Sequence, residues 1–463
     1  MTAPASRSAR LGWVLYDWAS QPFFTLVTTF VFAPYFTSHV VADPERGQAL
    51  WGYAVAVAGL VVAGLGPVLG AIADRAGRRK PWIMASLVLM AGGCWALWYA
   101  APGNEALVPA ILAAFVIATI GAEMGVVFTN AMMPGLAPAD RLGRLSGQGW
   151  AAGYAGGLVS LALVLGLMAA DPATGRTLAG LAPIFGLDAA AHEGARASGP
   201  FSALWLLAFA WPLLVFTPDR PRGLAIGAAA RAGLADLGAT LREARANGPL
   251  WRFLIGHMAY VDGLAALFAF GGIYAAGVFG WTIVEVGLFG IGLTFVGVAG
   301  ALAGGWLDDR FGPKPVVIGS ALVLLIVSAT IVSIGPTSIL FVVDLAPGTG
   351  AGLYDSPAEK VYFGLGLLIG VVAGPLQASS RTWLLALAPA GREAQMFGLL
   401  QLSGKATSFL APAAVATATA LTGSQRLGVV PILAFLALGL ALVAGVPGRN
   451  RPRGIGGKSI EGS

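Results

Sequence analysis

The sequence predicts an all-α integral membrane protein with twelve transmembrane helices in two bundles of six. Three observations predict this fold: the composition, the length of the apolar runs and an internal repeat. Of the 463 residues, 57% are apolar and 11% are charged, and the mean hydropathy is +0.78. Soluble domains carry about 25% charged residues, so the composition places this chain in a lipid bilayer.

Twelve apolar runs have the length of a membrane-spanning helix, which is about 20 residues. They lie at 11–37, 51–73, 82–101, 106–132, 146–169, 200–217, 251–278, 284–306, 315–335, 361–388, 394–421 and 427–447. The segment between the sixth and seventh runs is rich in Ala, Gly and Arg and predicts an amphipathic surface helix. We therefore expect a first bundle at 1–216, a cytoplasmic linker at 217–250, a second bundle at 251–448 and a cytoplasmic tail at 449–463.

The two halves share motifs at matching positions. Gly70–Lys80, GAIADRAGRRK, and Gly305–Lys314, GWLDDRFGPK, both fit G-x-x-x-D-R-x-G, with their Asp-Arg pairs 235 positions apart. A second pair, Leu136–Gly147 and Leu387–Gly398, is offset by 251 positions. In the loop motif the first glycine permits close approach of a neighbouring helix, and the last permits a tight turn.

The basic residues indicate the orientation of the chain. Of the 28 Lys and Arg residues, 21 lie on the predicted side of the two termini and 5 on the opposite side. This bias places both termini in the cytoplasm and the protein in the inner cell membrane as a multi-pass protein. Because the net charge of +6 is scattered between apolar spans, we expect no nucleic-acid partner.

The sequence offers no sign of a cofactor. The single cysteine, Cys94, and the three histidines form no metal-ligand cluster, so we expect no metal site. No Walker loop is present, which argues against an ATP-driven pump.

Several segments resemble one transporter family. The two loop motifs resemble the short cytoplasmic loops after helices 2 and 8 of the major facilitator superfamily. Within it, Tyr16–Phe36 resembles the helix 1 signature of the vacuole-effluxer-like branch, Tyr260–Gly263 its helix 7 signature and Gly374–Pro412 its helix 10–11 block. That branch contains the autophagy-related amino-acid effluxers of the fungal vacuole. The resemblance implies the major facilitator fold and secondary transport by alternating access, while Ser20-Gln21-Pro22 departs from the helix 1 signature.

Five ionisable residues lie inside predicted spans, where a charge is costly unless it is paired or faces water. They are Asp17, Glu123, Asp262, Arg381 and Lys405, and the resemblance places their helices around the central cavity. We expect Lys405, together with Arg381, to attract a substrate carboxylate or another anionic group, and the three acids to take up and release a coupling proton. The alternative is that Asp17 or Glu123 forms a structural pair with Arg381.

Neutral residues extend the candidate substrate site. The offset of 251 aligns Arg381 with Asn130 and Lys405 with Tyr154. The expected substrate-binding residues are therefore Lys405, Arg381, Asp262, Asn130, Tyr154, Gln377 and Gln401. The loop motifs contribute gating residues, which we expect to stabilise the outward-facing state: Asp74, Arg75, Arg78, Asp309 and Arg310. Tryptophans near the predicted interfaces, among them Trp13, Trp51 and Trp281, are expected to anchor the helices in the headgroup region.

Together these features predict a monomeric secondary active transporter of a small polar solute, not an enzyme. The family resemblance implies that the solute is amino-acid-like and is exported, and the acids inside the predicted spans indicate coupling to protons or another ion. One alternative is a transporter of amphipathic or lipid-like molecules or drugs. The other is a non-transporting membrane receptor or enzyme, against which the twin loop motifs and the lack of a catalytic constellation argue.

Overall fold

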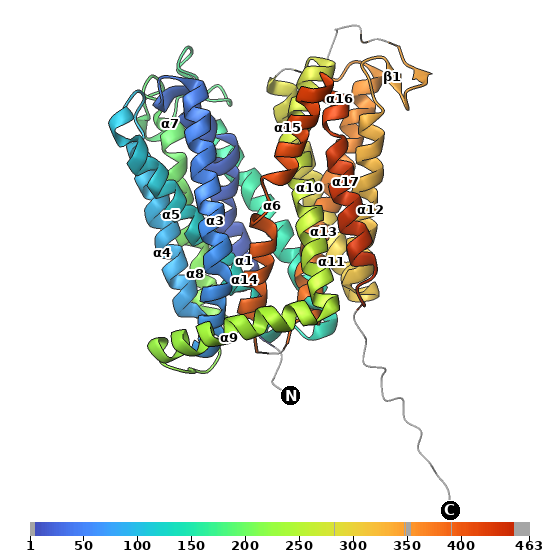
Figure 1. Cartoon of the computed structure of the whole chain (residues 1–463). Helices are drawn as coiled ribbons and strands as arrows, with labels where there is room; N and C mark the ends of the chain where they lie inside the picture. Colours follow the sequence, from blue (N-terminus) through green and yellow to red (C-terminus); the bar gives the residue numbers. More distant parts are fainter. Residues whose placement is uncertain (1–4, 282, 347, 349–352, 390, 449–463) are drawn as a thin grey trace, which may run out of the picture.

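The computed structural model describes residues 5–281, 283–346, 348, 353–389 and 391–448. In this part of the chain the fold is almost entirely helical. Two helical bundles stand side by side, and the linker helix α9 (Ile226–Ala246) lies across one end of both (Figure 1). We call this end the α9 side and the other end the opposite side.

The helices of each bundle follow the order of the predicted spans. The first bundle contains α1 (Arg7–Pro22) and its continuation through α2 (Phe32–Tyr35), then α3 (Pro44–Ala76), α4 (Lys80–Ala96), α5 (Val108–Asn130), α6 (Leu142–Leu167) and, after the short α7 (Glu193–Arg196), α8 (Ser198–Phe216). The second contains α10 (Gly248–Phe279), α11 (Ile283–Phe311), α12 (Pro313–Val332), α13 (Pro357–Leu387), α14 (Glu393–Lys405), α15 (Leu410–Thr422), α16 (Gln425–Gly428) and α17 (Val430–Ala444). A small antiparallel hairpin, β1 (Ser338–Ile339) and β2 (Val343–Asp344), lies in the loop before α13.

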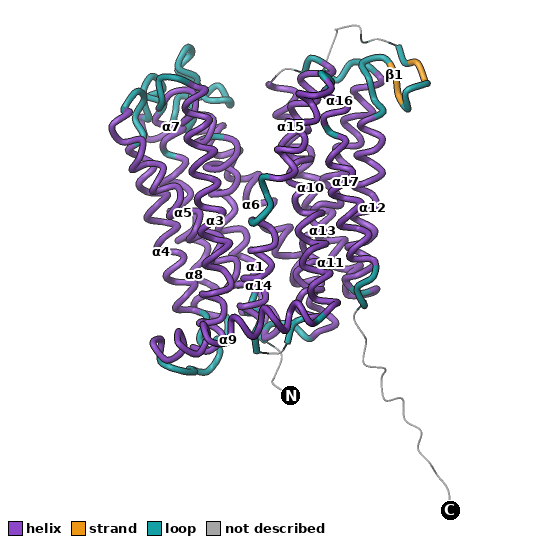
Figure 2. Tube along the Cα trace, in the orientation of Figure 1, coloured by secondary structure: helices purple, strands orange, loops and turns teal. Residues whose placement is uncertain are grey.

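Among the described residues, eleven helices are long and apolar enough to span a membrane. The expected eleventh span, 394–421, is instead divided into α14 and α15, with a turn half-way along the molecule (Figure 2). Pro412 has no amide hydrogen to bond the Ser408 carbonyl, and its ring crowds that carbonyl. Gly404 and the hydroxyl of Ser408, which bonds the Lys405 carbonyl, weaken the same turn. These residues explain why the span is broken.

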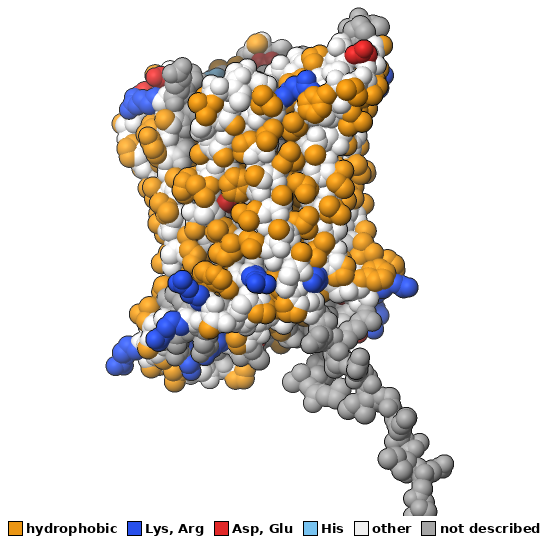
Figure 3. All heavy atoms as spheres, turned by 45° about the vertical axis from the view of Figure 1, so that its right-hand side comes forward, with side chains coloured by type: hydrophobic (Ala, Val, Ile, Leu, Met, Phe, Trp, Pro, Cys, Tyr) orange, Lys and Arg blue, Asp and Glu red, His pale blue; other side chains and the backbone are white. Residues whose placement is uncertain are grey.

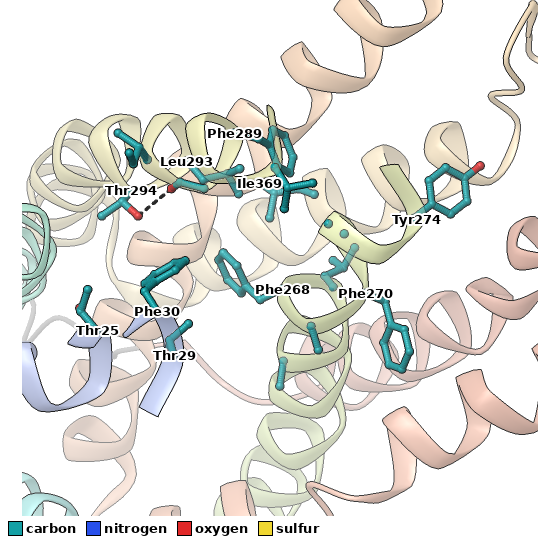
Figure 4. A pocket seen from close by; sticks show the side chains of 18 of the residues that line it. Thr25, Thr29, Phe30, Phe268, Phe270, Tyr274, Phe289, Leu293, Thr294 and Ile369 are labelled. Atoms are coloured by element: carbon teal, nitrogen blue, oxygen red, sulfur yellow. Dashed lines mark hydrogen bonds between the residues drawn. The ribbon is translucent and has the colours of Figure 1, made fainter. Parts of the chain in front are cut away.

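The first expected span, 11–37, is also irregular. α1 ends at Pro22, and the chain continues as a wider π-helical segment, Phe23–Phe30. Such segments are rare and occur frequently at functional sites. Here the wider turns aim the side chains of Thr25 and Thr29 into a cavity (Figure 4).

The bundles meet through small residues, as the loop motifs predict. A Cβ atom added to Gly70 of α3 would lie 2.5 Å from the Ala394 carbonyl oxygen at the start of α14. A Cβ atom added to Gly305 of α11 would lie 2.6 Å from the Gly143 carbonyl oxygen of α6. The expected close approach at both glycines is thus confirmed. The last glycine of each motif has the positive φ of a tight turn, +82° at Gly77 and +88° at Gly312.

The surface is that of a multi-pass membrane protein. Hydrophobic side chains cover the wall between the two ends, and more of the visible Lys and Arg side chains lie toward the α9 side (Figure 3). The expectation for the tryptophans is wrong in three cases. Trp13, Trp51 and Trp281 are buried within the protein, because each packs in a cluster of aromatic or charged side chains rather than against lipid.

Candidate functional site

A cavity of about 990 Å³ lies between the two bundles. The first bundle contributes residues of Phe23–Phe30 and α6, and the second contributes residues of α10, α11 and α13 (Figure 4). Aromatic side chains dominate the wall, with Phe30, Phe268 and Phe289 facing the same space. None of the described residues that line this cavity carries a charge. Its polar groups include Gln21, Thr25, Thr29, Tyr154, Thr294 and Gln377.

Two of these polar groups lie one helical turn from a charged pair. Gln21 and Gln377 line the cavity, and Asp17 and Arg381 follow four residues nearer to the α9 side on α1 and α13. Residues four apart share one helix face. The Asp17–Arg381 pair therefore lies one helical turn beyond the cavity, on its α9 side.

Arg381 joins α13 of the second bundle to three helices of the first. Its Nη1 donates to Asn130 Oδ1 at 2.8 Å and to Asp17 Oδ2 at 3.4 Å, and its Nη2 donates to the Ser146 carbonyl at 3.2 Å. The guanidinium lies 5.8 Å from the Trp13 ring centroid and 5.3 Å from that of Trp150. Only 6% of Arg381 is exposed. The structural pair considered for Asp17 is thus present, and Asn130, the repeat counterpart of Arg381, is its direct partner.

A second charged pair joins the bundles at the break in the eleventh span. Lys405 Nζ of α14 lies 2.8 Å from Glu123 Oε1 of α5. Gln401 Nε2, one turn earlier on α14, donates to Glu123 Oε2 at 2.9 Å. The Lys405 side chain is 33% exposed and that of Glu123 is 10% exposed. Glu123 therefore pairs with Lys405 rather than with Arg381, and Lys405 keeps access to solvent.

The two loop motifs make equivalent contacts across the bundle interface. Asp74 Oδ2 accepts the Gln395 amide at 2.8 Å, and Asp74 Oδ1 accepts the Ala394 amide at 3.3 Å, both in the first turn of α14. Asp309 Oδ1 accepts the Arg144 amide of α6 at 3.1 Å. Amides in the first turn of a helix lack intrahelical partners, and the helix dipole favours a negative charge there. Each aspartate thus caps a helix of the other bundle.

The motif arginines divide into different environments. Arg79, which the sequence reasoning did not single out, is buried and pairs with Asp74 at 2.5 Å and with Glu393 at 3.6 Å. Arg220 of the linker also binds Glu393, at 2.7 Å. The expected gating residue Arg310 lies over the rings of Trp306 and Phe311 on its own helix. The other two expected gating arginines, Arg75 and Arg78, are exposed.

Asp262 differs from the other membrane acids. It is 1% exposed, and neither carboxylate oxygen has a hydrogen-bond partner among the described residues. The Thr407 hydroxyl lies beside this carboxylate without forming a hydrogen bond. Near it on α10, His257 Nδ1 lies 3.0 Å from Ser403 Oγ. The structure thus places Asp262 at the contact of α10 with the broken span, and not among the residues lining the cavity.

Sequence reasoning missed several residues of these networks. Gln21 was noted only as a departure from a family signature, although it lines the cavity. Its place one turn from Asp17 was a usable signal. No such signal marked the Ser146 carbonyl, Trp13 or Glu393. A backbone acceptor or an acid at the end of a loop can be recognised as part of a network only when the position of the opposite bundle is known.

Two bundles of membrane-spanning helices around a central cavity, held together by paired loop motifs, define a transporter of the major facilitator type. Solved structures share this fold. The transporter FucP in the outward conformation aligns with 94% of this chain and 97% of its own, with a TM-score of 0.66 and 15% identity. The proton:xylose symporter XylE aligns with 95% of each chain, with a TM-score of 0.65 and 16% identity.

Residues 46–453 match the model of the family described as vacuole effluxer Atg22 like, and the chain belongs to this family. It is 24% identical to the uncharacterized MFS-type transporter YxiO of Bacillus subtilis over 94% of both chains. It is also 30% identical to autophagy-related protein 22-2 of Emericella nidulans, over 44% of this chain and 32% of that one. The protein is accordingly a membrane transporter and not an enzyme.

Proposed function

We propose that this transporter exports a small amino-acid-like solute by alternating access, using an ion gradient. The observation that supports the proposal best is the Lys405–Glu123 pair, 2.8 Å long and linking the two bundles. A free amino acid carries one ammonium and one carboxylate on the same carbon. Its carboxylate can replace Glu123 as the partner of Lys405, while its ammonium pairs with Glu123. Such a ligand gives both charges a partner and so avoids the cost of leaving the largely buried Glu123 unpaired.

The uncharged cavity suits a solute with an apolar side chain. Its wall is formed by aromatic rings and by threonine and glutamine groups, so it offers apolar surface and few directional contacts. Tyr154, Gln377 and Gln21 would orient the ligand through neutral hydrogen bonds. The same wall favours the alternative class, an amphipathic solute without a free ammonium group. The two classes differ in whether they require the charged pair.

The aspartate contacts support a gating role for the loop motifs. Asp74 and Asp309 bind amides of the opposite bundle, so these contacts exist only while the bundles are closed at the α9 side. We assign the α9 side to the cytoplasm, in line with the 21-to-5 bias of basic residues. The Asp17–Arg381 pair forms a second barrier between this gate and the cavity. The bundles, at 1–216 and 251–448, rock about these contacts.

The coupling ion is best assigned to Asp262. Asp17 is paired with Arg381 and Glu123 with Lys405, and a paired carboxylate holds its charge without an added ion. Asp262 is buried and has no hydrogen-bond partner within the ranges that the structure describes. A buried carboxylate in this state binds a proton or another cation readily, because the cation removes an uncompensated charge.

A thermal-shift screen of the purified protein tests the substrate assignment. Leucine or phenylalanine is expected to raise the melting temperature, and the analogue without the amino group and the analogue without the carboxylate are not. Lys405→Ala should abolish the shift. Lys360→Ala, which removes an exposed lysine elsewhere, is the matched control and should keep it. An unchanged shift in Lys405→Ala would remove the charged pair from the site, and equal shifts with the analogues would favour the amphipathic class.

Uptake into proteoliposomes tests transport itself. The solute that stabilises the protein should accumulate when a cation gradient is imposed, and Asp262→Asn should accumulate less. Equal uptake with every gradient collapsed at fixed voltage would show an uncoupled carrier.

A further inference from the structure

We propose that the break between α14 and α15 is a binding site for a monovalent metal cation, with Asp262 as its charged ligand. Only one part of this inference rests on the proposed function, namely the role of the bound ion in transport. The binding site itself follows from the geometry of α10 and the broken span, and its test requires no transported solute.

The register of the two helices brings Asp262 to the break. α10 and the eleventh span both run away from the α9 side, and His257 faces Ser403 at 3.0 Å. Five residues further along α10, Asp262 lies beside Thr407, which is in the turn that separates α14 from α15. The carboxylate therefore faces the one stretch of this helix pair where the backbone leaves helical geometry.

The break supplies oxygen atoms that a regular helix would use internally. In this turn the Ser408 amide bonds the Lys405 carbonyl and the Leu410 amide bonds the Thr407 carbonyl. The bonds that would join the Thr407 amide to the Ser403 carbonyl and the Ser408 amide to the Gly404 carbonyl are absent from this described stretch. Unwound carbonyls and the C-terminal ends of half-helices are the groups that coordinate Na⁺ in transporters with discontinuous helices.

The surroundings of Asp262 and Thr407 indicate a cation site rather than a structural hydrogen bond. Both oxygens of the Asp262 carboxylate and the Thr407 hydroxyl oxygen are buried, and no residue in the described part of the chain forms a hydrogen bond with them. One carboxylate with neutral hydroxyl and carbonyl oxygens matches a single positive charge. The nearby cation of the protein, Lys405, is directed to Glu123 of the other bundle. The other titratable group on this face of α10, His257, bonds Ser403.

The internal repeat shows that this break is specific to the second bundle. The offset of 251 aligns the turn at 406–409 with residues 155–158, which lie inside the unbroken α6 (Leu142–Leu167). The repeat therefore does not require a break. Its presence opposite a buried, unpaired acid indicates a local function.

Lys405 connects this site to the proposed solute site. Lys405 is the last residue of α14, directly before the turn, and its ammonium binds Glu123. An ion that orders the turn between α14 and α15 fixes the position from which Lys405 reaches across to the first bundle. Binding of the cation and of the solute should therefore favour each other, by the same factor in both directions.

The test measures cation binding to the purified full-length protein without solute. Melting temperature is recorded in NaCl, LiCl and KCl against N-methyl-D-glucamine chloride at equal ionic strength and pH. We expect at least one of the metal cations to give a saturable rise. Asp262→Asn should lose that rise, and Thr407→Val should need about tenfold more cation, the effect of losing one contact to a charge. Thr417→Val, an exposed threonine on α15, should behave like the wild type.

Two results would overturn the site. If no metal cation shifts the melting temperature of a folded wild-type protein, the break does not bind one. If Asp262→Asn and Thr407→Val keep the full cation-dependent shift, the cation binds elsewhere. Because a fold-competent Asp262→Asn is required, its monodisperse elution serves as the check. A solute-induced shift that survives without any cation effect would leave the proposed transport function standing and remove only this site.

Discussion

Neutralising Asp74 should release the bundles at the α9 side. In Asp74→Asn the carboxylate no longer carries the charge that binds the Gln395 and Ala394 amides at 2.8 and 3.3 Å. A hydrogen bond to a charged group contributes about 1.5–3 kcal/mol. When the bundles separate, Asp74 keeps its pair with Arg79 of the same bundle and loses only the two amides, so this amount is lost from the closed state alone. The ratio of open to closed molecules at the α9 side should therefore rise about tenfold to 150-fold.

The internal repeat contains a second contact of the same kind, so the effect can be measured independently at a second position. Asp309→Asn removes the equivalent contact to the Arg144 amide at 3.1 Å. The two contacts join different helix pairs, α3 with α14 and α11 with α6. Effects of mutations at separate sites usually add within about 0.5 kcal/mol. The double variant should therefore shift the equilibrium by the product of the two single effects.

Electron–electron distance measurements between spin labels provide the assay. Labels at Ala139→Cys and Pro315→Cys, both exposed near the α9 side, report the separation of the two bundles. The native Cys94 is buried and is the chain's sole cysteine, so Cys94→Ala gives a suitable background. Solute binding at fixed conformation should change little. Unchanged distance distributions in both single variants, with the protein folded, would refute the gating role.

Two further predictions concern pairs described above. Arg381→Gln leaves Asp17 buried without its partner and should lower the free energy of unfolding by about 3 kcal/mol. The double variant Asp17→Asn with Arg381→Gln should recover more than half of this loss. If the losses of the two single variants simply add when measured by chemical denaturation, the pair is not coupled. On the opposite side, the rings of His39 and His192 stack at 4.0 Å, and burial and the neighbouring His39 lower the pKa of His192 from 6.5. The neutral ring is favoured in the folded loop, so its contribution is complete above about pH 6.5 and is lost as the pH falls through the lowered pKa. Hydrogen exchange in 171–197, corrected for its intrinsic pH dependence, should become faster on acidification in the wild type and stay constant in His192→Phe.

The sequence was sufficient to predict the fold because its strongest pattern is the series of long apolar runs that a lipid bilayer requires. A run of about 20 apolar residues has few stable alternatives to a spanning helix. The matched glycines of the loop motifs also predicted where helices come closest, and the contacts of Gly70 and Gly305 confirm it. These are local properties of composition and spacing, so they can be read without knowing which helices are neighbours.

The pairing of charges could not be predicted in the same way. Glu123 and Lys405 are 282 positions apart in the chain, and only the placement of α5 against α14 decides that they meet. The break at 406–409 was hidden for a different reason. Gly404, Ser408 and Pro412 each weaken a helix, but the apolar residues around them keep the whole run long enough to be read as one span.

The linker helix α9 has a consequence for the size of the movement that the bundles can make. Gly233 of α9 packs closely against the backbone of Ala71 and Ile72 in α3, so α9 is held on the first bundle. Asn247 alone separates α9 from α10, and its side chain accepts the Leu250 amide and so fixes the direction in which α10 begins. A single residue spans only about 3.6 Å when extended. The first turn of α10 therefore cannot move far from α3 unless α9 detaches from the first bundle. We expect the length of this linker helix to limit how far the transporter can open toward the α9 side.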